Sequence, residues 1–231
     1  MRLPQFIPPF SVLAPTVGAI ALAACNTSSG ATRTQDGATA RSVVQAAAPD
    51  SFVQRIDQAR ILGAPTAKVW MVMASDFQCP YCKQWHDASF ATIRHDYVDN
   101  GKVRMAFLNF PLRQHANAFP AAEAAMCAGA QGKFWPMHDA LFAAQQRWEI
   151  LPEPRPVFDS LAASVGIDTT AMGACITAQR PDAMILADED RAERAGVKST
   201  PTIIIGTQVL AGAQPTAVYR HVLDSAIAAA K

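Results

Sequence analysis

The sequence predicts an α/β domain that is interrupted by a block of helices. A strand, a helix and a second strand follow one another over residues 68–110, and such a unit forms a pair of parallel strands. Strand patterns return only at residues 202–211, shortly before the end of the chain. We therefore expect one α/β domain made of residues 52–112 and 196–231, with an inserted α-helical domain at residues 113–195.

The first strand, helix and strand are predicted from apolar runs and their boundaries. Residues 68–75 (KVWMVMAS) form a short apolar run between turn-forming segments, which indicates a buried strand. Residues 80–97 carry large apolar side chains at helical spacing, and Asn100-Gly101 ends that helix. Residues 103–110 (VRMAFLNF) form the second strand.

The rest of the chain is predicted to be mostly helical. Apolar spacing, cap residues and glycine stops indicate five helices in the insertion, at residues 120–130, from Trp135 onward, and at residues 156–165, 168–178 and 181–195. Two short strands at residues 202–205 and 208–211 flank the turn Gly206-Thr207, and residues 216–230 form a last amphipathic helix.

Composition limits the classes of function. The chain has 231 residues, of which half are apolar, so it can bury a substantial core. Twenty basic residues against 19 acidic ones leave a formal net charge of +1. A protein that binds nucleic acid through phosphate neutralisation needs a much stronger positive field. We therefore expect no nucleic-acid partner.

The first 24 residues resemble an export signal. Arg2 is followed by an uncharged, largely apolar stretch with a small-residue exit, the three parts of a secretory signal. Prolines at positions 8, 9 and 15 would break a membrane-spanning helix, which argues against a permanent transmembrane anchor. The exit Leu22-Ala23-Ala24-Cys25 resembles a bacterial lipobox. Cleavage there would leave Cys25 as a lipid-modified first residue.

The alternative is an ordinary signal cleavage near the same place, in which Cys25 plays no part. Either route puts the mature chain in the periplasm or cell envelope, where disulfides persist. Residues 25–51 are rich in Ala, Thr, Ser and Gly without apolar periodicity, so we expect a flexible tether. With Cys25 lipidated, this tether would hold the domain at a membrane surface.

Two cysteines stand where the first strand gives way to the helix, in Cys79-Pro80-Tyr81-Cys82. The first turn of a helix has unpaired N–H groups and a partial positive charge, which stabilise a thiolate. We therefore expect Cys79 to have a lowered pKa and to be an exposed nucleophile. Cys82 lies one turn further on and can attack a mixed disulfide formed at Cys79.

A pair of cysteines at this spacing could instead form half of a zinc site. A structural zinc site needs four ligands, usually from a second such pair, and the sequence has no second pair. The other histidines and cysteines show no spacing that completes a site: His86, His95, His115, Cys127 and His138. We predict redox chemistry and no metal or other cofactor.

Three separated segments together resemble the DsbA family of thiol:disulfide oxidoreductases, within the thioredoxin superfamily. They are residues 76–82 (DFQCPYC), 134–142 (FWPMHDALF) and 197–202 (VKSTPT), in the same order as in that family. The resemblance covers about residues 52–231. It implies a thioredoxin fold with an inserted α-helical domain.

The same resemblance assigns roles to individual residues. It implies Cys79 as nucleophile, Cys82 as resolving thiol and Pro201 in cis. The backbone of Thr200 would then be exposed and would recognise the backbone of an extended substrate segment, which adds to it as a further strand. Pro80 and Tyr81, between the cysteines, occupy the positions that tune the redox properties of the pair.

The sequence departs from the family at one position. Many relatives carry a buried Glu six residues before the nucleophile, where this chain has Met73. A carboxylate there would help to move the proton of Cys82. Asp76 is closer in sequence, although an acid at that place is equally well explained as a helix cap.

The remaining cysteines, Cys127 and Cys175, fall in the predicted insertion. Some relatives hold a second disulfide at similar positions, and the resemblance therefore favours a structural disulfide between them. Two buried free thiols or a second redox pair are the alternatives.

The expected activity is oxidation of exported proteins that carry free thiols. A membrane partner of the DsbB kind would then reoxidise Cys79 and Cys82, and we expect a monomer. One alternative is a reductase or isomerase supplied by a DsbD-like membrane donor. A peptide-binding, chaperone-like lipoprotein that uses Thr200 and Pro201, and a copper(I)-binding protein that uses the cysteine pair, are the others.

Overall fold

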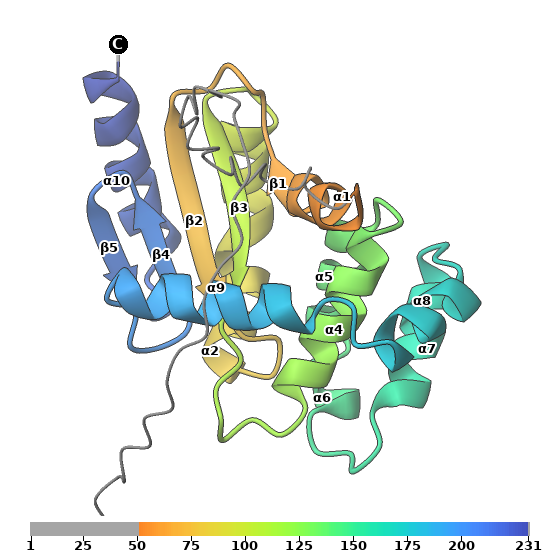
Figure 1. The fold of residues 1–231 in the computed structure, drawn as a ribbon. Coiled ribbons are helices and arrows are strands. Elements are labelled where there is room, and N and C mark those ends of the chain that lie inside the picture. Colours follow the sequence, from red (N-terminus) through yellow and green to blue (C-terminus); the bar gives the residue numbers. More distant parts are fainter. Residues whose placement is uncertain (1–50, 231) are drawn as a thin grey trace, which may run out of the picture. The chain divides into compact units, whose positions relative to one another are not determined.

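The computed structural model describes residues 51–230 (Figure 1). The predicted signal peptide, Cys25 and residues 26–50 of the predicted tether lie outside the described residues. Five strands form one sheet in the order β1-β3-β2-β4-β5. The strands are β1 (Ile61–Leu62), β2 (Val69–Ser75), β3 (Val103–Asn109), β4 (Thr202–Ile205) and β5 (Gln208–Ala211).

The central strands of the sheet come from both sides of the helical insertion: β2 and β3 precede it, and β4 follows it. β2 pairs in parallel with β3, as the strand–helix–strand pattern predicts. β4 pairs antiparallel to β2 on its other side, with Ala74 opposite Thr202. This pairing brings the start of β4 beside the end of β2. β1 and β5 are antiparallel edge strands. The predicted α/β class is confirmed.

The helical segment after β2 is one continuous stretch with two wider turns. It comprises α2 (Pro80–Trp85), a π-helical turn η1 (His86–Phe90), α3 (Ala91–Ile93) and a second π-helical turn η2 (Arg94–Val98). The sequence predicts a regular helix over residues 80–97, so its extent agrees but its regularity does not. Such π-turns often occur near functional sites.

Between β3 and β4 the described chain is helical. The helices are α4 (Ala118–Gly129), α5 (Phe134–Ala143), α6 (Gln145–Trp148), α7 (Arg155–Ser164), α8 (Thr169–Thr177) and α9 (Asp182–Arg194). The side chain of Asp168 caps α8 by accepting the N–H groups of Thr170 and Ala171, at 2.9 and 3.0 Å. α6 has only four residues, too few for a periodic pattern, and was not predicted.

The start of the described chain also differs from the prediction. α1 (Ser51–Ala59) and β1 precede the first predicted strand. Phe52 and Ile56 are both buried and stand one helical turn apart. These two side chains anchor α1 to the core, so Ser51 belongs to a helix rather than to the expected tether.

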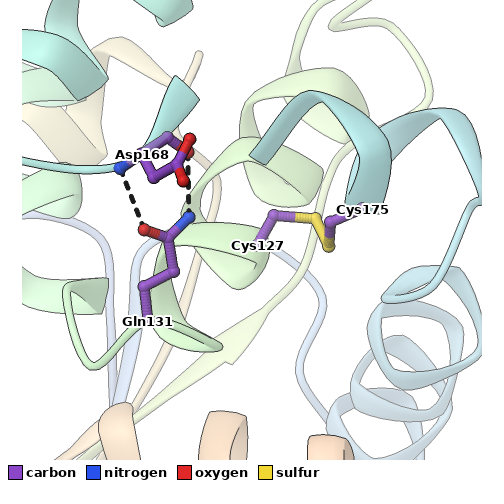
Figure 2. The surroundings of a disulfide bond; sticks show 4 residues. All are labelled: Cys127, Gln131, Asp168 and Cys175. Atoms are coloured by element: carbon purple, nitrogen blue, oxygen red, sulfur yellow. Dashed lines mark hydrogen bonds between the residues drawn. A yellow bond between two sulfur atoms is a disulfide. The ribbon is translucent and has the colours of Figure 1, made fainter. Parts of the chain in front are cut away.

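A disulfide links two helices of the insertion. Cys127 of α4 and Cys175 of α8 are bonded, at a sequence separation of 48. Figure 2 shows that Gln131 and Asp168 lie beside the disulfide. Gln131 accepts the backbone N–H of Asp168 at 2.9 Å and donates to its carbonyl at 3.1 Å. The hydrogen-bonded pair at its start and the disulfide near its end together hold α8 against α4.

The two faces of the sheet are covered differently. One face carries Met71, Met73 and Phe107 into the main core, which α10 (Thr216–Ala229) helps to close with Tyr219 and Leu223. The opposite face is crossed by α9 in Figure 1. There a smaller cluster forms from Ala74, Phe110, Ala192 and Val197. Among the described helices, we find none whose length and apolar character would let it cross a membrane.

A buried ionic cluster ties α9 to β3. The carboxylate of Asp188 is fully buried and pairs with the guanidinium of Arg60. It also accepts the backbone N–H of Asn109 at 3.2 Å, the side-chain amide of Asn109 at 2.9 Å, and a hydrogen bond from Arg191 at 3.1 Å. Because these donors compensate its charge, Asp188 fixes the insertion against the sheet.

Candidate active site

The cysteine pair lies at the junction of β2 and α2. Cys79 is the N-cap of α2 and Pro80 is the first residue of the helix. Proline's lack of an N–H costs no hydrogen bond there, because an N–H at that position has no partner within the helix. Cys79 is 3% exposed and Cys82 is 1% exposed, and both are free thiols. The predicted exposure of Cys79 is therefore wrong. Its Sγ is turned inward and lies 3.4 Å from the carbonyl oxygen of Thr200.

The pKa values of the two thiols are shifted in opposite directions. The pKa of Cys79 is lowered to about 6, chiefly because the Cys82 thiol donates a hydrogen bond to its sulfur. Burial opposes this effect, while a hydrogen bond with Thr200 and the N–H groups of Tyr81 and Cys82 at the start of the helix add to it. Burial raises the pKa of Cys82 well above its ordinary value. Near neutral pH the reduced pair is therefore a Cys79 thiolate that accepts from a Cys82 thiol.

The segment before β4 forms the opposite wall of the site. The Thr200–Pro201 peptide bond is cis. Thr200 is 5% exposed, so its backbone is more enclosed than the sequence analysis expects. Its carbonyl oxygen faces the Cys79 sulfur. Tyr81 is 60% exposed and is the prominent apolar side chain on the outer side of the pair.

Asp76 holds the loop that leads to the nucleophile. Its buried carboxylate accepts the N–H groups of Gln78 and Cys79 at 2.7 and 3.2 Å. The other oxygen accepts the N–H of Leu112 at 2.9 Å and lies 2.6 Å from Nδ1 of His115. Asp76 is therefore a cap of the active-site turn.

Asp76 also contacts Cys82. Its backbone nitrogen lies 3.5 Å from the sulfur of Cys82. Met73, at the position of the family's Glu, is an apolar member of the main core.

The insertion reaches the same loop from the other side. Gln145 of α6 donates to the carbonyls of Phe77 and Cys79. Gln78 donates to the carbonyl of Glu149 and accepts the N–H of Asn117. The sequence analysis assigned no role to these amides. Their partners are backbone groups distant in the chain, for which a sequence pattern carries no signal.

One further cluster combines groups that can bind metals. His86, His138 and Asp139 place ligand atoms within 4.8 Å of one another. Both imidazoles hydrogen-bond to Asp139, at 3.3 and 2.7 Å. Burial lowers the pKa of His138 to about 4, so this ring is neutral at pH 7. The hydrogen bonds of this trio join the active-site helix to α5.

Comparisons with known proteins agree with the fold. A family model described as thioredoxin (Thioredoxin_4) matches residues 56–225. The chain is 26% identical over 156 residues to the probable disulfide bond formation protein D of Bacillus anthracis, and the match covers 62% of this chain and 68% of that protein. The structure of Wolbachia pipientis alpha-DsbA1 matches with a TM-score of 0.67 and 23% identity, covering 74% of this chain and 92% of that one.

A second relative is a much longer protein. The Na(+)/H(+) antiporter NhaA 3 of Salinispora tropica is 36% identical over 152 residues. That match covers 64% of this chain but 22% of the antiporter. The region that the family model matches contains the five strands and the cysteine pair. The chain belongs to the Thioredoxin_4 family and has the DsbA-like form of the thioredoxin fold.

Proposed function

We propose that this chain is an exported thiol:disulfide oxidoreductase that acts as a dithiol oxidase on exported proteins. The observation that carries the proposal is the paired acidity of the two thiols, with a Cys79 pKa of about 6 beside a Cys82 whose pKa is raised. The resemblance to disulfide bond formation protein D supports the same chemistry.

The proposed reaction begins with an oxidised Cys79–Cys82 disulfide. A substrate thiolate attacks the sulfur of Cys79, the bond to Cys82 breaks, and Cys82 takes up a proton. A second substrate thiol loses its proton and attacks the substrate sulfur of the mixed disulfide, so that Cys79 leaves as a thiolate. Two substrate thiols become one disulfide, and the two electrons stay on the cysteine pair.

The direction follows from which form of the pair is stabilised. A thiolate with a low pKa stabilises the reduced form and makes the disulfide more oxidising. The hydrogen bond from Cys82 and the helix N–H groups act on that thiolate. These contacts favour oxidation of the substrate over its reduction.

The test is the reduction potential of the pair in glutathione buffers, with a variant lacking Cys127 and Cys175 as control. We expect a value near the DsbA end of the known range, roughly −120 mV. A value near the thioredoxin end, roughly −270 mV, would refute an oxidase and indicate a reductase or isomerase. The control should give the same potential if Cys127 and Cys175 take no part.

The proposal extends to location and partners. A monomer in the periplasm or cell envelope, lipid-anchored through Cys25, would need a DsbB-like membrane partner to reoxidise it. A reductase would instead need a DsbD-like donor. Replacing Cys25 with Ser should abolish incorporation of a labelled fatty acid into the protein. Labelling of the variant to the level of the wild type would contradict lipid anchoring.

A further inference from the structure

The insertion contacts the backbone of the nucleophile through one buried side chain. Gln145 is 2% exposed and stands at the start of α6. Its Nε2 donates to the carbonyl of Phe77 at 2.7 Å and to the carbonyl of Cys79 at 3.1 Å. One primary amide nitrogen has two hydrogens, so both are used on the active-site loop.

The carbonyl of Cys79 is thereby held from two directions. It also accepts the N–H of Lys83 at 3.1 Å, which is the first hydrogen bond of the helix. Cys79 has the extended conformation of an N-cap, with φ −69° and ψ 124°. The two donors fix the orientation of the peptide group between Cys79 and Pro80, from which the helix N–H groups continue.

A second set of contacts anchors the residue in between. The side chain of Gln78 donates to the carbonyl of Glu149 at 2.7 Å and accepts the N–H of Asn117 at 2.6 Å. The amide of Asn117 then donates to the carbonyls of Trp148, Glu149 and Leu151. Residues 77, 78 and 79 are thus all bonded to the short segment of the insertion at residues 145–151.

We propose that Gln145 is a positioning residue for the Cys79 nucleophile, through which the helical insertion sets the reactivity of the cysteine pair. The inference rests on the proposed function and names the residue that tunes it. The thiolate is stabilised by directed groups, namely the Cys82 thiol, Thr200 and the N–H groups of Tyr81 and Cys82. These donors meet the sulfur only while the backbone of Cys79 keeps its N-cap geometry.

Electrostatics act in the same direction. The amide hydrogens of Gln145 carry partial positive charge and end on the backbone of the residue that bears the thiolate. In a buried site such fixed dipoles are weakly screened. Loss of this amide should therefore destabilise the thiolate more than the neutral thiol. The reduced pair then becomes less stable relative to the disulfide.

The test compares two amides of the same helix. Gln145→Met keeps the length of the side chain but removes both donors, and Gln145→Glu replaces the donors with a carboxylate. Gln146 is exposed, so Gln146→Met is the matched control. We expect the pKa of Cys79, followed by the ultraviolet absorbance of the thiolate, to rise by about one unit in Gln145→Met and further in Gln145→Glu.

The reduction potential provides a second readout. A tenfold smaller preference for the reduced form corresponds to about 30 mV towards more negative values. A purely structural role would lower the stability of the oxidised and reduced proteins equally and leave both the pKa and the potential unchanged. Folded variants with the values of Gln146→Met would overturn the proposal. If neither Gln145 variant folds, the role of Gln145 is structural and the proposal is wrong.

These results separate the two proposals. A wild-type potential near that of thioredoxin would refute the oxidase. It would leave the difference between Gln145→Met and Gln146→Met as a test of positioning. An oxidising wild type whose Gln145 variants match the control would refute the positioning role alone.

Discussion

Removing the thiol of Cys82 should weaken the acidity of Cys79 and with it the pH-dependent stability of the reduced protein. The pKa of Cys79 is about 6, against an ordinary value of 9.0. This folded-state pKa is depressed, so its stabilising contribution is complete above about pH 9 and is lost as the pH falls through about 6. A shift of this size amounts to about 4 kcal/mol at high pH and to about 1.4 kcal/mol at pH 7.

The Cys82 thiol is the largest cause of the shift. A hydrogen bond to a charged group contributes about 1.5–3 kcal/mol, which corresponds to about one to two pKa units. In Cys82→Ala we therefore expect the pKa of Cys79 to rise to roughly 7–8. The reduced variant should then lose most of the stabilisation of about 1.4 kcal/mol that the lowered Cys79 pKa contributes at pH 7.

The assay is the rate of alkylation by iodoacetamide as a function of pH. A Cys25→Ser background leaves Cys79 as the single free thiol of the variant, since Cys127 and Cys175 are bonded. Gln84→Ala, an exposed change on α2, is the control and should titrate like the wild type. A midpoint that stays at about 6 in Cys82→Ala would refute the reasoning and assign the acidity to Thr200 and the helix N–H groups.

Three further predictions concern stability. Asp188→Asn removes the buried carboxylate partner of Arg60 and leaves Asp57 as its remaining one, so it should cost about 3 kcal/mol in denaturant unfolding, whereas a loss below about 1 kcal/mol would contradict the ionic clamp. Burial raises the pKa of Glu123 to about 7, so ionisation of Glu123 destabilises the fold as the pH rises from about 4.5 through 7. Glu123→Gln should then stabilise the protein by about 1–2 kcal/mol at about pH 8 and have no effect at about pH 4, and a gain that does not depend on pH would argue against this cause. Replacing Cys127 and Cys175 with Ala should cost about 4 kcal/mol by loop entropy, measured by unfolding, and an unchanged midpoint would show that the closed loop adds nothing.

Features that depend on neighbouring residues in sequence were predictable. The apolar run before Asp76 corresponds to strand β2. The position of Cys79 at the start of a helix follows from the same local pattern. Asp168 caps its helix because its carboxylate reaches N–H groups two and three residues ahead. Each of these depends on a few residues whose geometry the backbone determines.

Features that depend on tertiary contacts were not predictable. Cys79 is buried because Thr200, far along the chain, approaches its sulfur. Gln145 acts through carbonyl groups, which every residue has, so no residue type marks its partners. α6 and β1 are too short for a periodic pattern, and tertiary contacts rather than propensity define them.

The position of β4 in the sheet has a consequence for how the protein is made. β4 lies between β2 and β5, but it is synthesised after the whole insertion. A nascent chain that has emerged only as far as residue 195 already contains Cys79, Cys82, Cys127 and Cys175, yet it lacks Thr200 and the strand that encloses the nucleophile. The reactive pair therefore stays uncovered on this side until residues 200–205 have been synthesised and β4 has paired with β2.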